Sequence, residues 1–403
     1  MDRSFVEAMP KLGFGYMRLP MKDGEIDIEQ LSAMTDLFLE RGFKYFDTSW
    51  FYGHGTSERA MKTCLVDRHP RESFYIADKL PAWGGAKTDE EAQGMFYESL
   101  ERTGAGYFDF FLLHNLGEHR TKYFDEFDIW NFLQARKAEG LIHHLGFSFH
   151  DKAAVLDQIL TDHPEMEFVQ LQINYADWES SSIESRKCYD VARRHNKPVV
   201  IMEPVKGGIL ANPPEEAKDV LRAVNPDASF PSWAIRFAAS LEGVLTVLSG
   251  MSTLEQVEDN TSYMQTFRPL DAREMEAVEQ ARQIIAAKPS VPCTACWYCA
   301  KGCPAHIAIP NLFMCANLYL NFGDLAFAKG KYNFNTTGQN LGKASDCLQC
   351  GRCERVCPQH IHIREELSKR FEGIKFVVYD TSDRTLDRGR KVCVSGQLNL
   401  PGF

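Results

Sequence analysis

One cysteine pattern occurs twice near the C-terminal end of the chain, and it constrains the fold more than any other feature. Both copies read C-x2-C-x2-C-x3-C-P, and they continue beyond the proline as CPAHIAI and CPQHIHI. The copies lie 54 residues apart, which indicates an internal duplication. The cysteines are Cys293, Cys296, Cys299 and Cys303 in the first copy, and Cys347, Cys350, Cys353 and Cys357 in the second.

This spacing predicts two [4Fe–4S] clusters that exchange their fourth ligands. Three cysteines at i, i+3 and i+6 can bind one cluster from a tight loop, while the fourth, followed by proline, reaches the other cluster. A pair of zinc sites is the competing interpretation, but zinc sites favour two ligand pairs per site. The predicted ligand sets are Cys293, Cys296, Cys299 and Cys357 for one cluster, and Cys347, Cys350, Cys353 and Cys303 for the other.

The pattern resembles that of two-cluster ferredoxins, with 43 residues between Cys303 and Cys347. The apolar segment 311–330 predicts a helix in this interval, with Cys315 as a core residue. The other cysteines, Cys64, Cys188 and Cys393, lie outside both motif copies. Because the N-terminus lacks a basic region followed by an apolar core, we expect a reducing, cytoplasmic location rather than secretion.

Charge and hydropathy argue against two classes of partner. The chain of 403 residues has a formal net charge of −10, which is unfavourable for binding nucleic acid or an anionic membrane. No stretch approaches the roughly 20 consecutive apolar residues that a membrane-spanning helix needs. We therefore expect neither nucleic acid nor a membrane as a partner.

The first 285 residues alternate between strand-like apolar runs and amphipathic segments. Helical patterns at 28–42 and 89–104 end in glycine, which is typical of a helix stop. Eight strands separated by helices predict a (β/α)8 barrel. A doubly wound sheet is the alternative, but no GxGxxG turn follows a strand here. The expected strands are 12–20, 45–53, 74–81, 108–115, 143–151, 168–177, 198–205 and 243–251.

In such barrels the chemistry lies at the C-terminal ends of the strands. The residues expected there include Asp47, Tyr52, Lys79 and His114, which together form a plausible acid catalyst. A free tyrosine has a pKa near 10, so it needs help to protonate a carbonyl oxygen at neutral pH. A lysine ammonium can lower that pKa, an aspartate can keep the lysine charged, and a histidine can orient the substrate.

These residues resemble the aldo/keto reductase family over roughly residues 8–285. FDTSWFYGHGTSE resembles the family signature, IADKLP the lysine strand and LLHN the histidine strand, and GFSFH, QLQINY, EPVKGG and VLSGMSTLEQVEDN follow in the family's order. The resemblance implies hydride transfer between NAD(P)H and an aldehyde or ketone, or the reverse reaction from an alcohol. Tyr52 would be the general acid, Lys79 and Asp47 would tune it, and His114 would orient the carbonyl.

The resemblance also implies a set of cofactor contacts, some of which depart from the family pattern. After Ser148 the family usually has Asn, and this chain has Phe149; Gln170 matches the second amide contact. Met202 replaces a stacking tyrosine, and the basic positions that would bind a 2′-phosphate hold Gly250 and Gln256, so we expect no strong preference for NADPH over NADH. The expected contacts are Ser148, Gln170, Met202, Glu203, Lys206, Gly207, Gly250, Gln256 and Asn260.

Some family members carry a C-terminal ferredoxin-like domain, and the whole chain resembles that subset. We expect a barrel over 1–285, a small, mainly helical iron–sulfur domain over 286–375, and a tail of unknown role over 376–403. The loops KGG (206–208) and SGMS (249–252) suit a dinucleotide pyrophosphate, and a flavin phosphate is the less favoured occupant.

Two alternatives to a nicotinamide-dependent carbonyl reductase stay open. The first is a ferredoxin-linked oxidoreductase whose clusters pass single electrons, with or without a flavin. Residues 286–375 hold 11 Lys+Arg and 6 Asp+Glu, so Lys301, Arg352 and Arg355 could meet an acidic ferredoxin or flavodoxin. The second is a non-catalytic, nicotinamide-binding redox sensor, which the complete set of four catalytic candidates argues against.

Overall fold

The computed structural model describes residues 1–181, 183–287, 290–322 and 325–372. The chain divides into two compact units, one over Met1–Ala286 and a second that begins at Ala287. The expected C-terminal tail, 376–403, lies outside the described residues. Among the described residues, no helix combines the length and the apolar character that crossing a bilayer requires.

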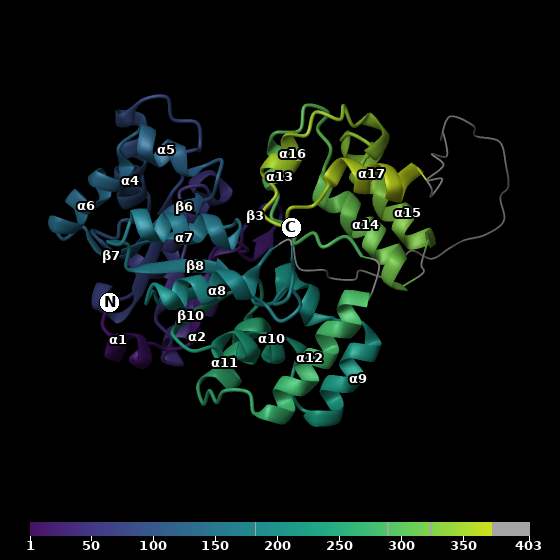
Figure 1. The fold of residues 1–403 in the computed structure, drawn as a ribbon, viewed down its shortest axis with the longest axis horizontal. Helices are drawn as coiled ribbons and strands as arrows, with labels where there is room; N and C mark the ends of the chain where they lie inside the picture. The colour runs from purple at the N-terminus through teal and green to yellow at the C-terminus, as the bar shows by residue number, and fades with distance from the viewer. Residues whose placement is uncertain (182, 288–289, 323–324, 373–403) are drawn as a thin grey trace. The chain divides into compact units, whose positions relative to one another are not determined.

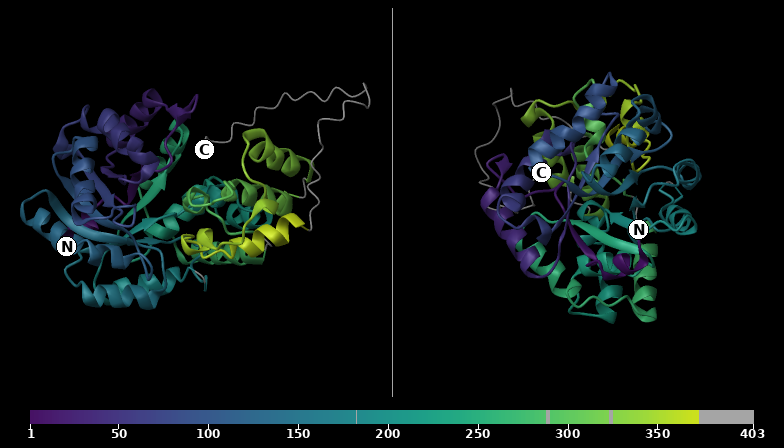
Figure 2. Two further views of the ribbon diagram at one scale, coloured as in Figure 1. Left: turned by 90° about the horizontal axis from the view of Figure 1, so that it is seen from above. Right: turned by 90° about the vertical axis from the view of Figure 1, so that its left-hand side faces the viewer.

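The first unit is built on a closed parallel barrel (Figures 1 and 2). Its strands follow the order β1-β10-β9-β8-β7-β6-β5-β4, and β4 closes the ring by pairing with β1. The expected (β/α)8 barrel is thereby confirmed, and the doubly wound alternative is wrong. The strands are β1 Leu12–Gly15, β4 Tyr45–Asp47, β5 Tyr75–Leu80, β6 Phe108–Leu116, β7 Ile142–Phe149, β8 Phe168–Gln172, β9 Val199–Met202 and β10 Val244–Gly250.

Helices cover the outside of the barrel (Figure 1), so the strands are apolar on both faces. All nine residues of β6 are buried. Helix α4 ends as its sequence predicts, because Gly104 adopts a left-handed φ of 63° just after the last turn. The helices of this unit are α1 Arg3–Ala8, α2 Ile28–Glu40, α3 Thr56–Met61, α4 Asp89–Thr103, α5 Thr121–Glu126, α6 Ile129–Ala138, α7 Ala153–Asp162, α8 Ser185–Arg194, α9 Glu215–Val224, α10 Phe230–Ala239, α11 Leu254–Met264 and α12 Ala272–Ala287.

Two elements at the start of the chain were not predicted. Helix α1 begins at its cap Asp2, and its Val6 and the following Met9 pack in one cluster with Tyr45 and Phe110 from the barrel strands. The hairpin of β2 Met21–Lys22 and β3 Glu25–Ile26 turns at Asp23–Gly24, where both residues have positive φ.

Several strands end earlier than expected, and this places the candidate site residues on turns. The strand expected over 45–53 ends at Asp47, and a 3-10 turn over Tyr52–Gly55 follows. Gly53 in this turn has φ 55°, and a Cβ there would lie 2.2 Å from the Thr56 hydroxyl, so the turn requires glycine.

The second unit is mainly helical and has its own core. The single helix expected over 311–330 is replaced by two helices, α14 and α15, which lie side by side (Figure 1). A short parallel bridge joins Ile307 to Gly342, and a Cβ on Gly342 would lie 2.1 Å from the carbonyl oxygen of Ala305. The helices of the second unit are α13 Tyr298–Lys301, α14 Ile309–Phe322, α15 Leu325–Asn335, α16 Arg352–Arg355 and α17 Ile363–Glu372.

Candidate active site and cluster cavities

Four predicted residues meet at the C-terminal end of the barrel. The fully buried Lys79 lies on β5, and its Nζ donates to Asp47 Oδ1 at 2.6 Å and to the Thr48 carbonyl oxygen at 2.6 Å. The same Nζ lies 3.5 Å from the Tyr52 hydroxyl. The ring of His114, on β6, meets the Tyr52 ring edge-on with centroids 5.8 Å apart. The structure therefore brings Asp47, Tyr52, Lys79 and His114 into one cluster.

The pKa of Tyr52 differs from the expectation. Burial raises this pKa well above its ordinary value, and the carboxylates of Asp47, Asp78 and Glu203 raise it further. The charge of Arg18 lowers this pKa, but by less than burial raises it. The expected lowering of the tyrosine pKa is thus wrong for the chain on its own. A high pKa keeps the phenol protonated, which is the state that a proton donor must start from.

His114 is neutral in this environment. Burial lowers its pKa well below the ordinary value, and the nearby cation of Lys79 adds to the effect. Its Nδ1 lies 2.9 Å from the Ser49 hydroxyl, and its backbone oxygen accepts from Trp83 Nε1 at 2.6 Å. These contacts leave Nε2 as the ring nitrogen available to a substrate, and they hold the imidazole in one orientation.

A row of polar side chains continues around the barrel from β6 to β9. Ser148 Oγ accepts from the backbone N–H of Asn115 at 2.7 Å, and Ser148 pairs in register with Gln170 on β8. Gln170 Nε2 lies 3.5 Å from the sulfur of Met202. Two buried polar atoms in this row have no partner among the described residues, namely Asn115 Nδ2 and Gln170 Oε1. Such atoms are uncommon in a folded chain and suit a polar ligand.

Lys206 is not available to a ligand in the way that the sequence suggested. It is buried, and its Nζ donates to both carboxylate oxygens of Asp177, at 2.5 and 2.6 Å. Glu203 and Lys206 both adopt left-handed φ angles, of 55° and 50°, and Gly207 follows at 63°. The ion pair therefore holds a strained turn after β9, and Lys206 is a positioning residue of that turn.

The predicted residues after β10 form a hydrogen-bonded helix start. Gln256 Oε1 accepts from the Ser252 N–H at 2.7 Å, and Asn260 Nδ2 donates to the Ser249 hydroxyl at 3.0 Å. Gly250 is exposed, and a Cβ there would lie 3.5 Å from Arg18. Sequence reasoning missed Arg18, which also acts electrostatically to lower the pKa of Tyr52. Its position just beyond β1 was the only available signal.

In the second unit, the eight motif cysteines line two cavities in the predicted combinations. One hollow is lined by Cys293, Cys296, Cys299 and Cys357, and another by Cys303, Cys347, Cys350 and Cys353. Each cavity thus receives three cysteines from one motif copy and the fourth from the other.

The duplication in the sequence is visible in the walls of these cavities. Ile361 and Ile363 line the first cavity, whereas Ile307 and Ile309 occupy the equivalent places in the second. Ile309 also lines the first cavity, so it lies between the two. The remaining described cysteines, Cys64, Cys188 and Cys315, are buried and line neither cavity, and Cys393 lies outside the described residues.

Comparison with known proteins identifies the family to which this barrel belongs. The model of the aldo/keto reductase family matches residues 11–283, and the model of the 4Fe-4S dicluster domain matches residues 292–362. The chain belongs to the aldo/keto reductase family and carries a C-terminal 4Fe-4S dicluster domain.

Individual relatives are distant. An aldo-keto reductase of Mycobacterium avium is 26% identical over 67% of this chain and 85% of its own length. One from Mycolicibacterium smegmatis is 28% identical over 34% of this chain, a match that spans 44% of that relative.

Solved structures resemble the barrel alone. An aldo-keto reductase from Bacillus halodurans (holo form) has a TM-score of 0.55 at 22% identity, and covers 67% of this chain and 91% of its own. One from Klebsiella pneumoniae in complex with NADPH has a TM-score of 0.56 at 19% identity, and covers 69% and 91%. At these identities, the likeness supports the fold.

Proposed function

We propose that the chain is a nicotinamide-dependent carbonyl reductase in which Tyr52 donates the proton. The proposal rests on the position of Lys79 Nζ, which lies within 3.5 Å of both Asp47 Oδ1 and the Tyr52 hydroxyl at the end of the barrel. A protonated phenol beside an ammonium can give its proton to a carbonyl oxygen, and the ammonium then stabilises the phenolate that forms. Asp47 keeps that ammonium charged and in place.

His114 is proposed to orient the carbonyl oxygen. Because the imidazole is neutral, only one of its nitrogens carries a proton. The Ser49 hydroxyl accepts from the Phe51 N–H at 3.2 Å. Its own hydrogen has two acceptors within reach, His114 Nδ1 at 2.9 Å and the Lys79 carbonyl oxygen at 3.4 Å, and we propose the nearer one, Nδ1. Nε2 then carries the hydrogen and donates to the substrate oxygen, next to the Tyr52 hydroxyl. The ring of Trp83 lies 5.7 Å from that of His114, and Trp50 follows the end of β4. These two tryptophans are the proposed walls of the substrate pocket.

A reduced nicotinamide, when bound, supplies the hydride. The residues present fit its carboxamide, because the orphaned Asn115 Nδ2 can donate to the amide oxygen and Gln170 Oε1 can accept from the amide nitrogen. Asn115 would thus supply the amide contact that the family usually obtains from an asparagine at the position of Phe149. Ser148 holds Asn115 in position, and Met202 would lie against the ring. The loops around the dinucleotide phosphates would be formed by Glu203 to Gly207 and by Gly250, Gln256 and Asn260.

We further propose that each cysteine cavity holds one [4Fe–4S] cluster. A [4Fe–4S] cluster requires four thiolate ligands, and four cysteines line each cavity. The hydride moves two electrons together, whereas each cluster passes one at a time, so in this proposal the clusters do not take part in carbonyl reduction.

One observation favours the ferredoxin-linked alternative. Cys350, a proposed ligand, is exposed, and its neighbour Leu348 is 67% exposed. An exposed cluster edge allows electrons to pass to a partner protein. This alternative predicts that the clusters are reduced by NADH or NADPH alone, as electron paramagnetic resonance would detect in an anaerobic sample.

Anaerobic turnover assays test the proposed function. Purified holoprotein with a panel of aldehydes headed by benzaldehyde is expected to oxidise reduced nicotinamide only when the carbonyl is present. Gly250 and Gln256 offer no cation to a 2′-phosphate, so we expect kcat/KM for NADH and NADPH to agree within about tenfold. Two charge-assisted hydrogen bonds to the 2′-phosphate would produce a larger preference for NADPH. A preference for NADPH above a hundredfold would contradict the cofactor proposal.

A further inference from the structure

Two buried carboxyl groups beneath Lys79 have no role in the proposed reaction. Glu58 lies on α3 and Asp78 on β5, and both are fully buried. Asp78 Oδ1 accepts from the Lys79 N–H at 2.7 Å, and Glu58 Oε2 accepts from Arg102 at 3.1 Å. Asp78 Oδ2 receives no hydrogen bond from any other described residue. The Glu58 carboxyl interacts with the Ser99 hydroxyl on α4 and with the Asp78 carboxyl.

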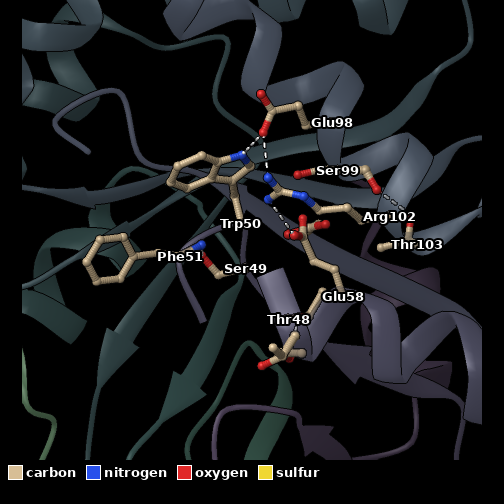
Figure 3. A network of polar contacts seen from close by, with 12 residues as sticks. Thr48, Ser49, Trp50, Phe51, Glu58, Glu98, Ser99, Arg102 and Thr103 are labelled. Atoms are coloured by element: carbon tan, nitrogen blue, oxygen red, sulfur yellow. Dashed lines mark hydrogen bonds and ion pairs between the residues drawn. The ribbon is translucent and has the colours of Figure 1, made fainter. Parts of the chain in front are cut away.

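Charges around the pair do not allow both groups to be ionised. From α4, Arg102 also binds Glu98 at 2.6 Å, so one guanidinium already faces two carboxylates (Figure 3). The ammonium of Lys79, on β5, is bound by Asp47 at the end of β4. Two ionised carboxylates in contact are strongly disfavoured in a buried site, and Asp78 Oδ2 has no donor to stabilise a charge. A proton on Asp78 Oδ2 satisfies that oxygen and can be donated to the Glu58 carboxyl.

We propose that Glu58 and Asp78 share one proton, held on Asp78 Oδ2 and donated to the Glu58 carboxyl, and that the pair is a positioning element for Lys79 and the Tyr52 loop. The catalytic part of this inference rests on the proposed function. Burial raises the pKa of both carboxyls, which agrees with a proton retained at neutral pH.

The pair acts on the site through two connections. Asp78 Oδ1 holds the backbone of Lys79 directly. On the other side, the contacts run from Glu58 through Arg102 to Glu98, which accepts from Trp50 Nε1 at 2.9 Å, two residues before Tyr52 (Figure 3).

The shared proton also limits negative charge near the proton donor. A charge on Asp78 raises the pKa of Tyr52, so loss of the proton makes the phenol a weaker acid. Because burial raises the pKa of both carboxyls, the pair keeps its proton to a higher pH than free carboxyls do, and the positioning effect is lost as the pH rises through that raised pKa.

Infrared spectroscopy of the holoprotein tests the proton itself. The wild type at neutral pH is expected to show a protonated-carboxyl C=O band that shifts in D2O, and the band is expected to be absent in D78N and in E58Q. Tyr52→Phe is the matched control and is expected to keep the band. Absence of the band in the wild type, or its persistence in both amide variants, would overturn the proposal, whether or not the chain reduces carbonyls.

Kinetics of the same variants test the positioning role. In D78N, the new amide oxygen can accept from the Lys79 N–H and the amide nitrogen can donate to Glu58. We therefore expect kcat within about threefold of wild type, a smaller change than the loss of one hydrogen bond would cause. E58Q leaves a full charge on Asp78 and is expected to have a lower kcat than D78N. D78A is expected to lose at least tenfold. Thermal melts identify variants that do not fold.

The pH profile separates positioning from a merely structural role. The alkaline fall in kcat/KM is expected to move to higher pH in D78N, because no proton is left to lose. An unchanged profile in D78N, or equal kcat values for D78A and D78N in folded proteins, would contradict the positioning role while leaving the infrared result to stand by itself.

Discussion

Replacement of Tyr52 by phenylalanine is expected to lower kcat with benzaldehyde by roughly 10²- to 10⁴-fold, which is the usual contribution of a general acid. The substitution removes only the hydroxyl, which lies 3.5 Å from Lys79 Nζ, and retains the ring that packs against His114. Because the proton moves only in the transition state, kcat and kcat/KM should fall together. Steady-state assays under anaerobic conditions measure both.

Tyr97→Phe is the control for this substitution. Tyr97 is 48% exposed on α4 and its hydroxyl binds Arg136, away from the site. We expect it to retain wild-type kcat, and we expect Tyr52→Phe to retain wild-type binding of the reduced nicotinamide. Full turnover by Tyr52→Phe would contradict the proposed mechanism and would favour a binding or sensing role.

Pairs of cysteine substitutions are expected to show which residues share a cluster. Cys299 and Cys357 come from different motif copies but line one cavity, whereas Cys353 and Cys357 come from one copy and line different cavities. We expect C299A/C357A to keep one cluster, with about four of about eight irons per chain. We expect C353A/C357A to lose both. Iron and sulfide analysis with visible spectra measures the outcome.

Cys64→Ala, in the barrel core, provides the control and is expected to keep both clusters. Equal iron contents in the two double variants would contradict the exchanged ligand sets. If C353A/C357A kept one cluster and C299A/C357A lost both, each cluster would instead belong to one motif copy.

The parts of the fold that could be predicted from the sequence are those with local, repeated signals. The strands of the barrel are continuous apolar runs because helices cover their outer faces, and β6 is buried throughout. The cysteine combinations followed from spacing alone, since the proline after the fourth cysteine ends the ligand loop. Helix α1 lacks such a signal, because its six residues are too few for a visible period.

The candidate site was predictable as a set of residues but not as an electrostatic arrangement. Positions at strand ends identified Tyr52 and Lys79, yet the direction of the tyrosine pKa depends first on how deeply the hydroxyl is buried and then on which carboxylates lie near it. The sequence likewise suggested Lys206 as a phosphate ligand, but in the structure its Nζ donates to both carboxylate oxygens of Asp177, 29 residues away in the chain. Such pairings depend on tertiary contacts, which periodicity does not encode.

The central claim is that hydride passes directly from the nicotinamide to the carbonyl carbon, and isotope transfer tests it most directly. Holoprotein is given nicotinamide deuterated on both hydrogens at the reactive ring carbon, together with benzaldehyde, in ordinary water under anaerobic conditions. The proposed mechanism predicts that the alcohol carries one deuterium on its carbinol carbon by mass spectrometry. An alcohol whose new carbon-bound hydrogen comes from water would contradict the claim and would indicate single-electron passage through the clusters.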